Sequence, residues 1–179
     1  MRLASIRTLG VTGSRTGKRI AETRVRRSVL RILRGNVLCS IATVTRDGRA
    51  HANTAYFACS DELELYFLSH PGALHCRNLS SNPSMAITVF DSSQRWGGLD
   101  RGLQLFGRCR EARGPWLRRA ERVYQRRFPS YPRWRAALGR EDSSTALRLF
   151  RFLPSRLKVL DEREFGRAIF VEALVERRR

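Results

Sequence analysis

The stretch from Val37 to Arg110 constrains the fold of this chain most. It opens with three apolar runs of strand length, which are separated by turn-like residues at 46–49 and 60–62. The first turn contains Asp47-Gly48, a pair that favours a type I′ hairpin because glycine adopts a positive φ without steric penalty. The sequence therefore predicts an antiparallel three-stranded meander over residues 37–69.

A short helix and two more strands are predicted after the meander. Pro71 and Gly72 interrupt the third strand, residues 73–80 read as a short helix, and Asn82-Pro83 ends it. Strands are expected at 85–90 and 103–109. Gly107 lies inside the second of these and predicts a bulge or a close approach of another backbone.

The flanking regions predict two longer helices and the closing strands. Apolar residues recur at helical spacing over 23–34 and again over 115–127, where Pro115 occupies the first turn. Residues 131–139 form a basic stretch with no assigned element. Strands are expected at 147–153, 156–160 and 167–171.

One domain is expected between two tails. Residues 1–20 are basic, lack acidic residues and are rich in Ser, Thr and Gly, so residues 1–22 are predicted to be a disordered tail. Residues 23–172 are predicted to form the folded domain. Residues 173–179 are expected to be a charged tail.

Positive charge is concentrated outside the predicted sheet. The net charge is +19, yet residues 35–107 hold five Arg and six acidic residues. The Arg-rich helix at 115–127, with Trp116, Tyr124 and Trp134 nearby, allows a nucleic-acid binder as an alternative. The less specific interpretation is favoured, because those aromatic residues have core spacing and Arg is the common basic residue throughout the chain.

Cysteine usage and hydropathy bear on the compartment. The four cysteines have no CxxC spacing, and three of them fall on apolar strand positions, as expected for buried thiols in a reducing compartment. No apolar run approaches the roughly 18 residues that a membrane-spanning helix needs. A cytoplasmic location without a membrane partner is the resulting expectation, and no metal-ligand spacing is found.

Polar residues gather where the third predicted strand ends. Ser69 and His70 precede the short helix, whose unpaired N–H groups favour an anion, and His75 and Arg77 lie on it. Taken singly, each residue reads as an ordinary surface group. Together they predict a phosphate pocket.

The order of these elements resembles a known family. The strings IATVTRDGRAHANTAYF and LYFLSHPGALHCRNLSSNPSMAITVF, over residues 24–111, are similar to the flavin-binding split β-barrel of the pyridoxamine 5′-phosphate oxidase superfamily. The strings RGLQLFGRCRE, RRAERVYQRRFPSY and EFGRAIF resemble a small uncharacterised bacterial subgroup of it. The resemblance implies a mainly β (α+β) fold: a six- to eight-stranded antiparallel split barrel with flanking helices.

The resemblance also implies a cofactor and a partner. Superfamily members are typically homodimers that hold FMN in a groove between two barrels, and apolar surface around Tyr56, Phe57 and Phe106 is expected to be covered by the second subunit. By the same resemblance the isoalloxazine and the ribityl phosphate are held by two groups of residues. The implied set is Asn53, Thr54, Ala55, Tyr56, Leu68, Ser69, His75, Arg77 and, from the neighbouring subunit, Arg101.

The chain departs from the oxidase pattern at the basic ligands. The oxidase has an Arg and a Lys on the second strand and an Arg-Lys pair on the short helix, where this chain has Asn53, Ala58 and Leu74-His75. This argues against the true oxidase reaction. The predicted function is an FMN-dependent oxidoreductase of unknown substrate and unidentified catalytic residues. The alternatives are a deazaflavin or a haem, which His70 and His75 allow, or a sensor or carrier without turnover.

Overall fold

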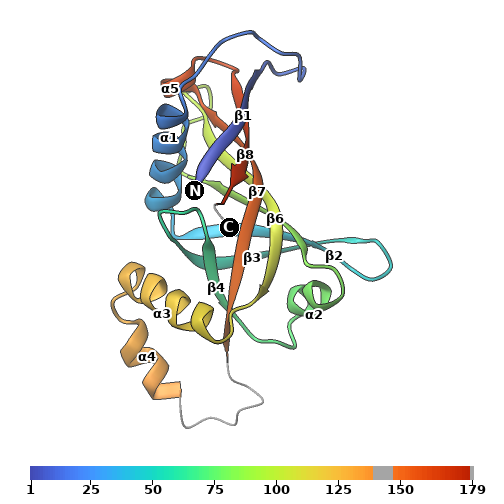
Figure 1. Cartoon of the computed structure of the whole chain (residues 1–179), viewed down its shortest axis with the longest axis vertical. Coiled ribbons are helices and arrows are strands. Elements are labelled where there is room, and N and C mark those ends of the chain that lie inside the picture. The colour runs from blue at the N-terminus through green and yellow to red at the C-terminus, as the bar shows by residue number, and fades with distance from the viewer. Residues whose placement is uncertain (139–146, 178–179) are drawn as a thin grey trace.

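The computed structural model describes residues 1–138 and 147–177, which form eight strands and five helices (Figure 1). The strands are β1 (Arg2–Leu9), β2 (Leu38–Val44), β3 (Ala50–Cys59), β4 (Leu65–Ser69), β5 (Ser84–Phe90), β6 (Arg101–Glu111), β7 (Arg148–Asp161) and β8 (Phe170–Glu176). The helices are α1 (Glu22–Gly35), α2 (Leu74–Ser81), α3 (Pro115–Arg127), α4 (Tyr131–Leu138) and α5 (Glu162–Phe165).

Six of the strands close into an antiparallel barrel. The sheet order is β1-β8-β7-β4-β3-β2-β5-β6, and an additional pairing of β6 with β7 closes the ring. β8 and β1 extend the sheet beyond β7, so β7 contacts three neighbouring strands. The predicted class, a mainly β antiparallel split barrel with flanking helices, is confirmed.

The interior of the barrel is filled by alternate residues of each strand. Along β2 the inward positions Cys39, Ile41 and Thr43 are buried while the residues between them are not. Phe57 of β3 is also buried in this core. The expectation that Phe57 lies on an exposed interface is therefore wrong, because Phe57 and the exposed Tyr56 are consecutive and point to opposite faces.

The predicted hairpin between β2 and β3 is present, but its turn differs from type I′. Only Gly48 has a positive φ, 84°. Thr45 N–H donates to the Arg49 carbonyl at 2.8 Å and Gly48 N–H donates to the Thr45 carbonyl at 3.0 Å. This pattern is a three-residue loop in which a type I turn is followed by one left-handed residue.

The loop between β3 and β4 repeats this geometry without a glycine. Ser60 N–H donates to the Glu64 carbonyl, Leu63 N–H donates to the Ser60 carbonyl, and Leu63 has φ 56°. Leu63 is buried in the core. Burial of its side chain offsets the cost of a left-handed backbone at a residue with a Cβ.

Gly107 fulfils both expectations for its position. The pairing of β6 with β7 shifts register between Phe106 and Gly107. A Cβ at Gly107 would lie 2.1 Å from the Leu153 carbonyl oxygen and 2.7 Å from the Pro154 Cα. The two backbones approach this closely only because residue 107 has no side chain.

The prediction of a disordered tail over residues 1–22 is wrong. Residues 2–9 form β1, which pairs antiparallel with β8, and Leu3 and Thr8 are buried. The register shifts between Ala4 and Arg7, where Ser5 has φ 51°. Because of this bulge, Leu3 and Thr8 are both buried although they are five positions apart in the sequence. The alternation of apolar and polar residues that identifies a strand is therefore lost.

The C-terminal assignments also need correction. The strands expected at 147–153 and 156–160 are one continuous strand, β7, and residues 173–176 of the expected charged tail belong to β8. Residues 178–179 of that tail lie outside the described residues. The basic stretch at 131–139 contains α4 up to Leu138, and residue 139 lies outside the described residues.

Candidate functional site

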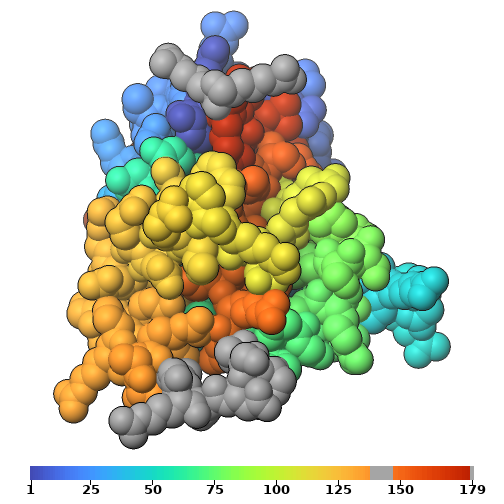
Figure 2. Space-filling model, turned by 60° about the horizontal axis from the view of Figure 1, so that its bottom comes forward, coloured from blue at the N-terminus to red at the C-terminus, as the bar shows by residue number. Residues whose placement is uncertain are grey.

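A cavity of about 800 Å³ lies between the barrel and the helices α3 and α4. Figure 2 shows this end of the molecule, with α3 and α4 in yellow to orange on the left and the green residues around α2 on the right. The barrel side is formed by the middle of β3, the end of β4 and the start of α2. The lining residues are Asn53, Thr54, Ala55, Tyr56, Leu68, Ser69, His70, His75, Tyr124, Phe128, Ser130, Tyr131, Trp134 and Leu147.

Aromatic side chains of α3 and α4 form the wall that faces β3. Tyr56 meets the Phe128 ring edge-on at a centroid distance of 6.1 Å, and the Tyr124 and Tyr131 rings are 5.1 Å apart. Burial raises the pKa of Tyr124 to about 12 and also raises the pKa of Tyr131, so both phenols stay protonated near neutral pH. The Tyr131 hydroxyl is buried and has no hydrogen-bond partner among the described residues.

A buried pair of polar side chains forms one corner of the cavity. Ser69 Oγ and His75 Nε2 are joined by a hydrogen bond of 2.7 Å. The His51 ring stacks on the His75 ring at a centroid distance of 6.3 Å. Burial, together with the charge of His51, lowers the pKa of His75, so its imidazole is neutral at physiological pH. This corner can exchange hydrogen bonds with a ligand without carrying a charge.

The cavity contains seven of the nine residues in the predicted site. Asn53 to Tyr56, Leu68, Ser69 and His75 line it. Arg77 lies instead on a separate cavity beside Arg110 and Glu111, and Arg101 begins β6 opposite Asp161. No Lys or Arg occurs among the described residues that line the site cavity. The expected replacement of the missing basic ligands is therefore not found within one chain.

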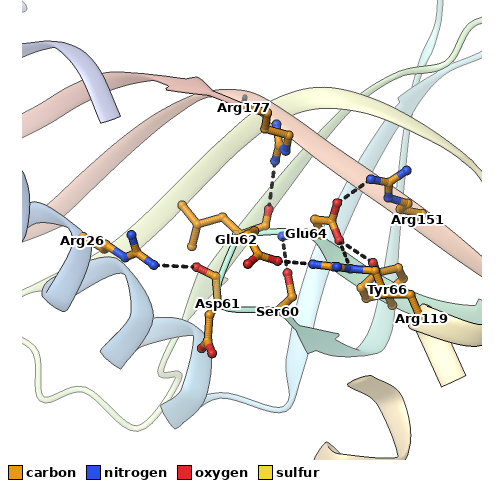
Figure 3. A network of polar contacts seen from close by, with 10 residues as sticks. Arg26, Ser60, Asp61, Glu62, Glu64, Tyr66, Arg119, Arg151 and Arg177 are labelled. Carbon is orange, nitrogen blue, oxygen red and sulfur yellow. Dashed lines mark hydrogen bonds and ion pairs between the residues drawn. The ribbon is translucent and has the colours of Figure 1, made fainter. Parts of the chain in front are cut away.

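A buried carboxylate fixes α3 against the barrel and so fixes the aromatic wall. Glu64 accepts hydrogen bonds from the Tyr66 hydroxyl at 2.6 Å, from Arg119 Nε at 2.8 Å and from Arg151 (Figure 3). Arg119 belongs to α3, whereas Tyr66 and Arg151 belong to β4 and β7. The Arg151 guanidinium also lies 3.4 Å from the ring centroid of Trp116, the second residue of α3.

Sequence reasoning missed the outer wall of the cavity. Tyr124 and Trp134 were interpreted as aromatic residues with core spacing or, in the alternative, as nucleic-acid contacts, and Tyr131 had no assigned role. Their signal in the sequence is a series of aromatic residues at helical spacing on both sides of Pro129. That series cannot show which surface of the barrel the helices cover.

The described residues contain no group of three or more His, Cys, Asp or Glu side chains placed to hold a metal ion. Within the same part of the chain, no helix has the length and apolar content required to cross a membrane.

One family model matches most of the chain. Its description is pyridoxamine 5′-phosphate oxidase, and it matches residues 26–157. This range contains every barrel strand except the last four residues of β7, and it contains the whole site cavity. Sequence comparison found no match to a curated protein.

Solved structures with the same fold carry different descriptions. A haem-binding protein from Mycobacterium smegmatis has a TM-score of 0.66 and 15% identity over 88% of this chain and 59% of its own. A FAD-binding protein from Mesorhizobium loti has a TM-score of 0.56 and 18% identity over 94% of this chain and 96% of its own. A Clostridium acetobutylicum protein related to general stress protein 26, of the pyridoxinephosphate oxidase family, has a TM-score of 0.59 and 10% identity over 79% of this chain and 91% of its own. At these identities the likeness concerns the fold.

Proposed function

Because the chain belongs to the pyridoxamine 5′-phosphate oxidase family, we propose that it is a flavin-binding oxidoreductase that holds FMN in the cavity between β3 and the helices α3 and α4. The single observation that carries this proposal is the shape and chemistry of that cavity. It is a slot of about 800 Å³ with a strand edge on one side and aromatic rings on the other. Such a slot suits a flat aromatic ring system with a few polar edges.

The polar groups in the slot fit the edges of an isoalloxazine. The buried hydroxyl of Tyr131 lacks a partner among the residues that the structure describes, and an unsatisfied buried donor is costly unless a ligand atom accepts from it. Asn53 and Thr54 add polar groups from β3. These residues hold, orient and shield the ring, whereas a flavin itself supplies hydride chemistry when it is bound.

The phosphate of FMN is the part that one chain does not fit. A phosphomonoester carries about two negative charges near neutral pH. The described lining offers Ser69 and two histidines but no Lys or Arg. We therefore assign the phosphate to the Ser69 and His75 corner and propose that a second subunit supplies the missing cation. This departure also speaks against the true pyridoxamine phosphate oxidase reaction.

An uncharged outer surface supports the proposed homodimer. The outward residues of β2 and β3 pair across the two strands, for example Leu38 with Tyr56 and Val44 with Ala50, and β5 continues this face to Phe90. No charged side chain occupies these outward positions, although 28% of the chain is charged. Tyr56 is 59% exposed in one chain, which suits coverage by a partner.

The cytoplasm is the proposed location. All four cysteines are free, and three of them are buried. Thiols persist in a reducing compartment, where disulfides are rare.

Haem is the second candidate, and a specific observation favours it. His70 and His75 both line the cavity, and imidazole is a common axial ligand of haem iron. The structural relative from Mycobacterium smegmatis is a haem-binding protein. The engagement of His75 Nε2 by Ser69 favours the flavin, because His75 would have to release Ser69 to ligate iron through that atom.

An absorbance spectrum of the purified protein, followed by equilibrium dialysis against FMN, riboflavin and haemin, tests the proposal. We expect FMN to bind and Trp134→Ala to weaken it at least tenfold, because Trp134 lines the slot. Trp96→Ala is the matched control, since Trp96 is fully exposed in the loop between β5 and β6 and does not line the slot. If the protein retains haemin but no flavin, the cofactor is haem and the flavin assignment is wrong. If the wild-type protein retains no cofactor, the proposal is overturned.

A further inference from the structure

Another cavity, of about 490 Å³, lies between α1, α3 and the loop that joins β3 to β4. α3 contributes different residues to this cavity and to the proposed cofactor site: Arg122, Val123 and Arg126 line this one, and Tyr124 lines the other. We call this space the arginine cavity. Its lining residues are Leu33, Arg34, Cys59, Ser60, Asp61, Glu62, Arg119, Arg122, Val123, Arg126 and Arg127.

The arginine cavity carries excess positive charge. Five guanidinium groups and two carboxylates line it, which leaves a formal charge of 5 − 2 = +3. In a concave site with apolar residues such as Leu33 and Val123 in its wall, this charge is less screened than on an open surface. The arrangement therefore favours an anion of more than one charge.

Three of the five guanidiniums build the cavity and are already engaged. Arg34 pairs with Asp61 at 2.6 Å, and Arg119 bonds Glu62 and the buried Glu64 (Figure 3). Arg127 donates to the carbonyls of Arg34 and Asn36 at the end of α1, both at 2.8 Å. These contacts hold α1, α3 and the 60–64 loop in a fixed relation, so the cavity is formed before any ligand arrives.

The other two guanidiniums have no partner in the described part of the chain. Arg122 and Arg126 line the cavity, and neither makes a hydrogen bond or ion pair with a described residue. They lie four residues apart on α3, so they share one helix face, where like charges destabilise the helix. A bound anion would relieve that repulsion and occupy both guanidiniums.

We propose that the arginine cavity binds a small anion with two or more linked phosphate groups, such as pyrophosphate or a nucleoside di- or triphosphate. Guanidinium groups bind phosphate oxygens in pairs of parallel hydrogen bonds. Two guanidiniums one helical turn apart, with Cβ atoms about 5–6 Å from each other, match two consecutive phosphates better than a single one. This site is independent of the proposed cofactor site.

Isothermal titration of the protein as purified, with pyrophosphate, ATP, AMP and inorganic phosphate as probes, tests this proposal. Pyrophosphate or ATP should bind with one site per chain and at least tenfold more tightly than AMP or inorganic phosphate. Arg122→Ala/Arg126→Ala should weaken this binding at least tenfold and leave the flavin content unchanged. If pyrophosphate and ATP bind equally, the polyphosphate alone is recognised; if ATP binds more tightly, the nucleoside contributes as well.

The matched control is Arg118→Ala/Arg133→Ala. It removes the same charge from α3 and α4 at exposed positions outside the arginine cavity, and it should change the affinity less than twofold. Equal loss in both double variants would assign binding to the overall charge and overturn the proposal. Absence of saturable pyrophosphate and ATP binding would overturn it as well, as would tighter binding of a single-stranded oligonucleotide that both double variants weaken equally.

Discussion

Ser69 Oγ lies 2.7 Å from His75 Nε2, and the two side chains are buried together where the end of β4 meets α2. The pair closes the polar corner of the larger cavity. The His51 ring stacks on the His75 imidazole, so a proton gained by His75 would be placed in a buried site beside a second histidine. The hydrogen bond is therefore suited to a neutral imidazole.

This pair predicts a pH dependence of stability. Burial lowers the pKa of His75 below its ordinary value of 6.5, so between the two values the unfolded chain binds more protons than the folded one. The contribution of His75 to the free energy of unfolding should be fully present above pH 6.5 and should decrease as the pH falls below that value. Urea unfolding at pH 7.5 and 5.5 measures this, and His75→Gln should reduce the difference. His70→Gln, which removes a histidine outside the pair, should keep the wild-type difference; equal reduction in both variants would contradict the assignment.

Among polar residues, Glu64 is the one whose substitution should lower the free energy of unfolding most. It is 4% exposed and accepts from Tyr66, Arg119 and Arg151. Burial by itself raises the pKa of Glu64, but the hydrogen bonds from Tyr66 and Arg151 outweigh it and the pKa is lowered. Glu64→Gln should lower the free energy of unfolding by about 3–5 kcal/mol at pH 7, because it leaves Arg151, whose side chain is 14% exposed, without its counter-charge and removes one of the two carboxylates that pair with Arg119.

Glu62→Gln is the matched control for Glu64. Glu62 lies two residues away and contacts the same Arg119, but its side chain is half exposed. Its loss should cost no more than about 1 kcal/mol, as for other exposed ion pairs. Denaturant titrations of both variants decide the matter. Equal losses would mean that Glu64 acts as an ordinary surface carboxylate.

The strands that carry the candidate site could be predicted from local pattern, because β3 follows a hairpin with a clear turn and the Pro71-Gly72 pair closes β4. The assignment of Asn53 to Tyr56 to a cofactor site came from the family resemblance. Arg77 was placed in the site because it is close to His75 in the chain. The two residues are separated by two positions on α2, and residues at that spacing do not share a helix face.

The parts that depend on distant segments could not be predicted. β1 exists because its backbone groups pair with β8 at the opposite end of the chain, and its bulge hides the strand periodicity. Trp134 and Tyr131 reach the cavity because Arg119 of α3 docks on Glu64, a contact between residues 55 positions apart. No pattern within either segment carries that information.

Replacing Gly107 by alanine, which adds only a methyl group, should strongly reduce the free energy of unfolding. In Gly107→Ala the new Cβ would overlap the backbone of Leu153 and Pro154, which cannot move away without breaking the pairing of β6 with β7. The loss in free energy of unfolding should reach about 3 kcal/mol or more. Gly102→Ala, on the same strand, is the control. Its nearest neighbour atom would be 3.8 Å away, so unfolding in urea should change by less than about 1 kcal/mol.

The uncharged face of β2, β3 and β5 predicts where a second subunit binds. Leu38 is 44% exposed on this face and lies beside Tyr56 of the proposed cofactor site. Leu38→Asp would place two charges in a symmetric interface, so we expect sedimentation velocity at micromolar concentration to shift from dimer to monomer. Leu174→Asp introduces the same charge on β8 at 42% exposure and should remain dimeric. A dimer that survives Leu38→Asp but not Leu174→Asp would move the interface to β8 and separate it from the cofactor cavity.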